Sequence, residues 1–144
     1  MARSVEQLIE DIKAYQPSGN ENDDLDRLYA ITESYESMGG LSRAVPVIID
    51  AFERFPEAWW GNPGPLVHLV EHCGGHVDLL IDSIRRTPTP TTVWMVNRIL
   101  NAAIHLDVRT KLLATLTFAA NDTRTSEATR TAARSFLDHQ SHRV

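Results

Sequence analysis

The chain has 144 residues, of which 42% are hydrophobic and 23% are charged, and its formal net charge is −5. This length fits one domain with a core that needs no metal or disulfide, and the single cysteine, Cys73, excludes an internal disulfide. No apolar run approaches the ~18 residues of a membrane span, and acids stand where a signal peptide is apolar, so we expect a cytoplasmic protein.

The charge is divided unevenly along the chain. Residues 1–82 contain 15 acidic and five basic side chains, whereas residues 83–144 contain four acidic and nine basic side chains. Nucleic-acid binding needs clustered Lys and Arg, and the basic side chains of the second part are spread over many helical turns. We therefore expect no nucleic-acid partner and no membrane partner. The acidic part favours a basic protein partner.

The first part of the chain predicts three helices, because apolar side chains recur at helical spacing without the alternation of a hairpin. We expect these helices at about residues 4–15, 23–38 and 42–55. A Pro-Ser-Gly-Asn segment separates the first two, and Gly39-Gly40 supplies the left-handed conformation that ends the second. The expected N-caps are Ser4 and either Asp23 or Asp24.

The remaining residues predict an aromatic loop and five more helices. In the loop, Glu57-Ala-Trp-Trp-Gly-Asn-Pro-Gly-Pro, burial of both indole rings is hard, so we expect one of them to face a partner. The domain should cover residues 1–138, and a frayed tail should occupy residues 139–144. The helices are expected at about residues 65–73, 77–86, 90–104, 108–120 and 127–138, with N-caps at Thr89, Asp107 and Ser126.

Two spacings suggest an internal repeat. The Gly-Gly breaks at 39–40 and 74–75 lie 35 residues apart, and Asp50 and Asp82, each expected in the second helix of a pair, lie 32 apart. Short connections predict that neighbouring helices are antiparallel, and periods of this size are typical of helical solenoids. We therefore expect an all-α, HEAT-like right-handed solenoid of about eight helices. A non-repeating helical bundle is the alternative.

One segment matches a zinc-protease pattern. His68-Leu-Val-Glu71-His72 has the form H-x-x-E-H, in which two imidazoles four residues apart on a helix can share Zn²⁺ and the glutamate can act as a base. A hydrolytic site also needs a third protein ligand and a substrate cleft, which the sequence does not indicate. His72 near a helix C-terminus can instead interact with the helix dipole. We expect no metal, and a small zinc hydrolase remains an alternative.

Other catalytic patterns are missing from the sequence. It contains no phosphate-binding glycine loop and no nucleophile elbow, and Cys73 occupies an apolar position typical of a buried structural thiol. The adjacent carboxylates Asp23 and Asp24 lack the apolar setting that would separate their pKa values. We therefore expect no enzymatic activity and no cofactor.

Two segments resemble a known family. Pro63-Gly-Pro-Leu-Val-His-Leu-Val-Glu71 and Arg86-Thr-Pro-Thr-Pro-Thr-Thr-Val-Trp-Met-Val-Asn-Arg-Ile-Leu100 are similar to segments of small helical immunity proteins of bacterial polymorphic-toxin and contact-dependent growth-inhibition systems. The resemblance covers about residues 25–120. It implies an all-α, HEAT-like fold and a cytoplasmic protein that binds and neutralises a cognate toxin domain, often a nuclease and sometimes an RNase A-like one. It carries over no catalytic residue and assigns no contact residue.

The acidic part and the resemblance together predict an immunity protein that occludes the active site of a basic toxin domain, as a monomer in a 1:1 complex. Nucleases that grip RNA tend to be basic, and an acidic partner can steer quickly onto such a cleft. A generic helical adaptor and a nucleic-acid binder that uses the basic part remain alternatives. The expected partner-binding residues are Asp50, Glu53, Asp78 and Asp82, with Glu57, Trp59 and Trp60 at the rim.

Overall fold

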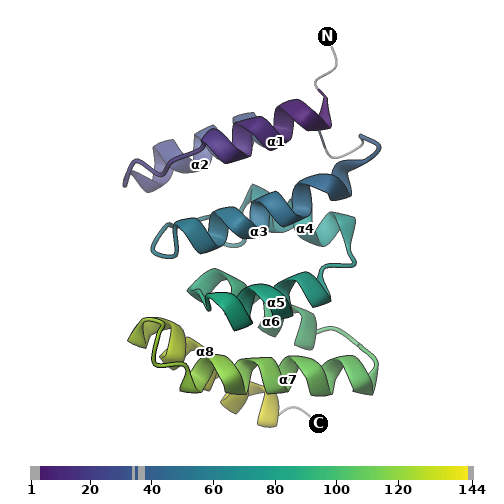
Figure 1. Cartoon of the computed structure of the whole chain (residues 1–144), viewed down its shortest axis with the longest axis vertical. Helices are drawn as coiled ribbons and strands as arrows, with labels where there is room; N and C mark the ends of the chain where they lie inside the picture. Colours follow the sequence, from purple (N-terminus) through teal and green to yellow (C-terminus); the bar gives the residue numbers. More distant parts are fainter. Residues whose placement is uncertain (1–3, 34, 36–37, 143–144) are drawn as a thin grey trace. The chain divides into compact units, whose positions relative to one another are not determined.

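A computed structural model describes residues 4–33, 35 and 38–142, and every regular element within these residues is helical, which confirms the all-α prediction. The chain folds as two compact units, residues 1–76 and 77–144, and we describe each by itself. The single domain expected over residues 1–138 stays a prediction. The elements are α1 (Val5–Ala14), α2 (Glu21–Thr32), the 3-10 helix η1 (Leu41–Ala44), α3 (Val45–Arg54), α4 (Pro65–Cys73), α5 (Val77–Arg86), α6 (Pro90–Leu100), α7 (Leu106–Asn121) and α8 (Glu127–Ser141) (Figure 1).

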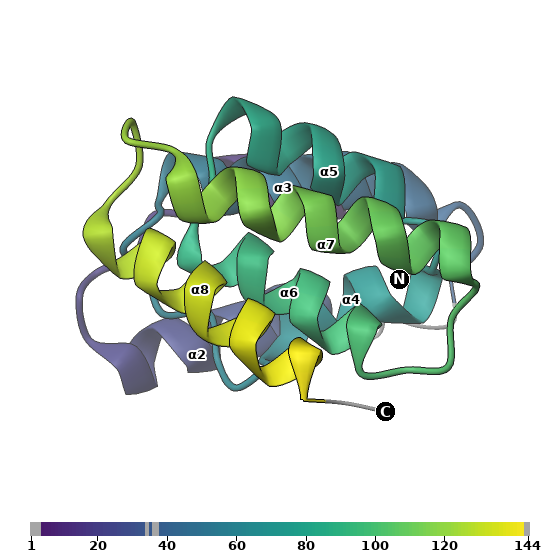
Figure 2. The same ribbon diagram turned by 90° about the horizontal axis from the view of Figure 1, so that it is seen from below.

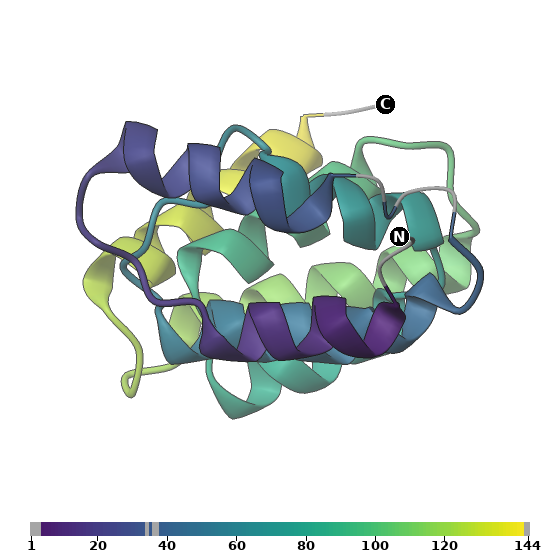
Figure 3. The same cartoon turned by 90° about the horizontal axis from the view of Figure 1, so that it is seen from above.

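The first unit consists of two helical hairpins in two layers. The hairpins are α1 with α2 and α3 with α4; α1 packs on α3 in one layer, and α2 packs on α4 in the other (Figure 3). Helices α1, α3 and α4 each bury an apolar stripe, as the sequence periodicity predicts, whereas the buried side chains of α2 are Asp24, Leu28 and Thr32. The core of this unit includes Leu8, Ile12, Leu28, Tyr35, Ile48, Phe52, Leu66 and Leu69.

The second unit repeats this arrangement. Its hairpins are α5 with α6 and α7 with α8; α5 packs on α7, and α6 packs on α8 (Figure 2). Thr89 and Thr92 form a reciprocal capping box before Pro90, which explains why α6 begins where the sequence predicts. Each unit therefore contains two hairpins, and the stacking of all four pairs into one solenoid stays a prediction.

Two of the candidate acids, Asp50 and Asp82, lie on the other helix of their pair than the sequence predicted. Asp50 lies on α3 and Asp82 lies on α5, which are the first helices of their hairpins and not the second. The reason is that the Gly-Gly breaks separate one hairpin from the next, whereas the loops within hairpins carry other turn residues. The expectation that second helices present these acids is therefore wrong.

Two N-caps also differ from the predicted ones. Asn20 caps α2, because its Oδ1 accepts the backbone N–H of Asp23 at 3.0 Å, and Asp24 turns back toward the preceding loop instead. His105 caps α7 in place of Asp107, since its Nδ1 accepts the Asp107 N–H at 3.2 Å. Each observed N-cap precedes the predicted one in the sequence, so both helices begin earlier than predicted.

Three helix ends differ as well. The described part of the second helix ends at Thr32, because Glu33 has the extended ψ of 135°, whereas the prediction ran to Met38, partly outside the described residues. Helix α6 ends at Leu100, short of the predicted residue 104. Helix α8 continues to Ser141, so the predicted frayed tail is wrong over residues 139–141.

The end of α8 is held by a buried polar network. The Gln140 side chain is 1% exposed, and its amide nitrogen donates to Oδ1 of Asn97 at 2.7 Å and to Oδ1 of Asn101 at 2.9 Å. Arg109 donates to the side-chain oxygen of Gln140 at 3.3 Å. A buried amide needs such partners, so this turn is fixed and not frayed. Residues 143–144 of the expected tail lie outside the described residues.

Candidate functional site

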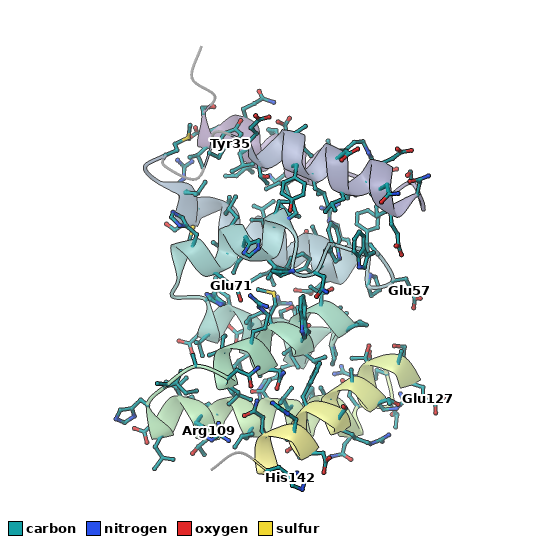
Figure 4. All side chains as sticks on the ribbon, turned by 180° about the vertical axis from the view of Figure 1, so that it is seen from behind. Tyr35, Glu57, Glu71, Arg109, Glu127 and His142 are labelled. Carbon is teal, nitrogen blue, oxygen red and sulfur yellow. The ribbon has the colours of Figure 1, made fainter. Side chains whose placement is uncertain are left out.

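A groove of about 490 Å³ lies in the first unit, between the loop that follows α1 and the loop that follows α3. Two of the predicted contact residues, Glu57 and Trp59, line it. Figure 4 shows Glu57 at the edge of the unit, with its side chain directed away from the helices. The other lining residues are Gln16, Pro17, Gly19, Glu21, Asp24, Arg54, Phe55, Pro56 and Ala58.

Asp24 holds one wall of the groove in place. Its carboxylate accepts the hydroxyl of Ser18 at 2.6 Å and the backbone N–H groups of Ser18 and Gly19 at 3.0 and 3.3 Å. Arg27 completes the set with an ion pair at 2.8 Å. The Ser18 hydroxyl and the Arg27 guanidinium lower the pKa of Asp24 to about 2, because hydrogen bonds to the charged form favour it. The loop after α1 is thereby tied to the first turn of α2.

Arg54 holds the opposite wall. Its guanidinium donates to the Asp50 carboxylate at 3.1 Å and to the backbone carbonyls of Ile12 and Lys13 at 3.4 Å each. It also lies over the Phe55 ring, 5.2 Å from the centroid. The end of α3 is therefore fastened to the end of α1. Asp50, an expected partner contact, is already engaged in an exposed ion pair within its own helix.

Trp60 is an anchor of the loop and not a surface residue. Its side chain is 3% exposed, with its ring centroid 5.6 Å from that of Tyr15 and 5.2 Å from that of Phe52. Trp59, the preceding residue, is 40% exposed. The prediction that Trp60 contacts a partner is therefore wrong, because it fills the core of the unit. Trp59 is the exposed indole of the pair, and its contact with a partner stays a prediction.

Glycines allow the loop to turn back tightly after Trp60. Gly61 and Gly64 both have positive φ, at 113° and 83°. A Cβ on Gly64 would overlap the backbone carbonyl of Trp60, so no other residue fits at this position. The close approach fixes the backbone at Trp60 and with it the position of the exposed Trp59.

Two carboxylates of the groove remain uncompensated. Among the described residues, Glu21 and Glu57 make no hydrogen bond or ion pair through their side chains, whereas Asp24 is paired with Arg27. Arg54, the cation that lines the groove, is balanced by Asp50. The groove therefore carries a net negative charge next to an exposed indole. This combination suits a cation.

The other predicted contact residues do not join this groove. Glu53 is half-buried on α3 and interacts with neighbouring residues, so it is not a free surface acid. Asp78 and Asp82 are exposed on α5, in the second unit. Asp78 lines a separate groove of about 410 Å³ together with Arg85 and Lys111, so its surroundings are of mixed charge. The expected binding of a partner by Asp78 and Asp82 stays a prediction.

Arginines of the second unit bind the carbonyl ends of helices. Arg109 donates to the backbone carbonyls of Leu100 and Gln140. The other such bonds run from Arg124 to the carbonyl of Arg85, from Arg130 to that of Asp122 and from Arg134 to that of Ala120. Helix C-termini carry partial negative charge, which these cations satisfy. Four of the nine basic side chains of residues 83–144 thus bind helix ends, and the absence of a nucleic-acid partner stays a prediction.

The zinc-protease pattern does not assemble into a site. His68 and His72 are both exposed on α4, and Glu71 is half-buried and interacts with neighbouring residues. Within the described ranges, the structure brings together no group of three or more His, Cys, Asp or Glu side chains that could hold a metal ion. Burial raises the pKa of the Cys73 thiol, which favours the neutral form over the nucleophilic thiolate. None of the helices in the described part of the chain has the length and apolar character for crossing a membrane.

Comparison with known proteins finds no match, whether with family models, with curated protein sequences or with solved structures.

Proposed function

We propose that the chain is an immunity protein that binds and neutralises a bacterial toxin domain in the cytoplasm. The observation that carries this proposal is the net negative charge of the groove in the first unit. Within the described residues, Glu21 and Glu57 line this groove without an ion pair, next to the exposed indole of Trp59. The resemblance of residues 63–71 and 86–100 to immunity proteins supports the same function.

The mechanism is non-covalent occlusion of a basic active site. A nuclease holds its substrate through phosphate contacts, so its cleft concentrates positive charge. An acidic protein is steered toward such a cleft and can cover it, and neither step needs a cofactor or turnover. We expect a 1:1 complex with one copy of the chain.

Co-purification with the toxin domain encoded next to this chain tests the proposal. We expect a stable complex, inhibition of the toxin's activity in vitro and protection of cells that express it. The association rate should fall steeply between 50 and 500 mM salt, because screening weakens steering between opposite charges. Absence of a complex, or failure to protect cells, would contradict the proposal.

A further inference from the structure

We propose that the groove between the loops after α1 and α3 receives an arginine side chain of the toxin domain. In this complex the guanidinium lies between Glu21 and Glu57, and its flat face covers the indole of Trp59. The inference rests on the proposed function for the identity of the partner. The groove's preference for arginine can be measured without that partner.

The charge of the groove selects a cation. Glu21 and Glu57 are uncompensated, and each offers two acceptor oxygens. A guanidinium has five donors in a planar fork, so it can bind two carboxylates at once. Arg54 itself points elsewhere, because its guanidinium donates three hydrogen bonds, to Asp50 and to the carbonyls at the end of α1.

The exposed indole favours arginine over lysine. Tryptophan is the aromatic ring that attracts cations most strongly, and a guanidinium stacks flat on it, whereas an ammonium is compact and strongly hydrated. Trp59 is 40% exposed, although large aromatic side chains are usually covered. Pro17, Phe55 and Pro56 give the groove apolar walls that can cover the methylene stem of the entering residue.

The size and the fixed walls of the groove support a specific fit. About 490 Å³ falls within the ~300–1,000 Å³ typical of ligand pockets. Asp24 fixes the loop after α1, Arg54 fastens α3 to α1, and Trp60 anchors the loop that presents Trp59. A groove whose walls are already ordered loses little conformational entropy when it binds.

The direct test titrates the full chain with three short peptides that differ in one side chain. The peptides are acetyl-Gly-Arg-Gly-amide, its lysine counterpart and its citrulline counterpart, a neutral isostere of arginine. We expect saturable shifts of the Trp59 indole N–H resonance with the arginine peptide, about threefold weaker binding with lysine and none with citrulline. Equal binding of the citrulline peptide, or no saturable binding of the arginine peptide, overturns the inference.

Matched variants locate the binding. Trp59→Ala and Glu57→Gln should each weaken the binding of the arginine peptide about fivefold or more, because each removes one of the proposed contacts. Tyr29→Ala removes another exposed aromatic ring, and Glu33→Gln removes a carboxylate at the far end of α2, about 18 Å from Glu21 along the helix axis. These two controls should bind as the parent chain does. Equal losses in the controls overturn the inference.

The same variants in the toxin assay separate this inference from the proposed function. If the chain binds the arginine peptide but forms no complex with the toxin, the result supports an arginine site in the groove and contradicts the immunity function. If the Trp59→Ala and Glu57→Gln variants bind the toxin with full affinity, the result supports the immunity function and overturns the inference that the toxin binds in the groove. Weakening of the complex by at least tenfold supports both, provided that circular dichroism shows each variant to be folded.

Discussion

The indole of Trp60 packs edge-on against the ring of Phe52, with centroids 5.2 Å apart and an interplanar angle of 66°. This contact sets the orientation of the whole loop, because it leaves the preceding indole of Trp59 at the surface. We therefore expect opposite consequences from the two neighbouring tryptophans. We expect Trp60 to stabilise the unit and Trp59 to contact the proposed partner.

Trp60→Ala should lower the free energy of unfolding by about 3–5 kcal/mol, because it leaves a cavity between Tyr15 and Phe52. Trp59→Ala should lower it by well under half as much, since the side chain is partly exposed. Urea unfolding of the two variants checks this difference. Equal losses would mean that Trp59 is as much a part of the core as Trp60.

Gly64→Ala should be more destabilising than Gly74→Ala. Both glycines have positive φ with extended ψ, a conformation that costs other residues about 1–3 kcal/mol. A Cβ on Gly74 meets nothing within 4 Å, whereas one on Gly64 overlaps the Trp60 carbonyl. Thermal melts of the two alanine variants isolate the effect of that overlap. Similar melting temperatures would show that the loop can relax around a methyl group.

Gln140→Ala should lower the free energy of unfolding of the second unit by about 2–3 kcal/mol. The change removes two buried donors and leaves Oδ1 of Asn97 without this partner. His139→Ala, at the neighbouring exposed position, should change it by less than about 0.5 kcal/mol. Denaturant unfolding compares the two variants. A loss no larger for Gln140 than for His139 would indicate that the end of α8 is frayed after all.

The stability of the first unit should fall as the pH drops below about 6.5, and His76 should account for part of this. Burial lowers the pKa of the His76 imidazole below its ordinary 6.5, although the Glu71 carboxylate and the backbone at Gly74 oppose the shift. Between the lowered pKa and 6.5 the unfolded chain binds more protons than the folded one, so the free energy of unfolding rises with pH and levels off above 6.5.

A comparison of His76→Gln with His68→Gln measures this contribution. We expect urea unfolding between pH 5 and 7.5 to show a weaker pH dependence for His76→Gln than for the parent chain. His68 is exposed, so its replacement should leave the pH dependence as it is in the parent chain. The prediction is contradicted if both variants keep the parent's slope.

The sequence predicted two helix starts correctly. Thr89, which is followed by a proline, and Ser126, which is followed by a glutamate, are the N-caps in the structure, and both helices begin as predicted. The start of α2 was missed because Asn20, Asp23 and Asp24 can all accept N-cap hydrogen bonds. Only the folded structure shows that the Asp24 carboxylate accepts hydrogen bonds from Ser18 instead of capping α2.

The candidate site was only partly predictable for a similar reason. The aromatic loop drew attention to Glu57 and Trp59, but local sequence could not decide which of two adjacent indoles would find Phe52. Glu21 was missed because the predicted helix began at residue 23, which left Glu21 in the preceding segment instead of the first turn of α2. A count of charges cannot show which arginines are free at the surface. Arg109 and Arg134 bind backbone carbonyls that lie far away in the sequence.

The decisive measurement is the affinity of the toxin domain for the parent chain and for the doubly charge-reversed Glu21→Lys/Glu57→Lys variant. We expect a folded variant whose complex is weaker by at least tenfold, mostly through slower association that no longer depends steeply on salt. Capture of the toxin by the reversed variant at the parent's rate and affinity would contradict the claim that the acidic surface of the first unit neutralises a basic partner.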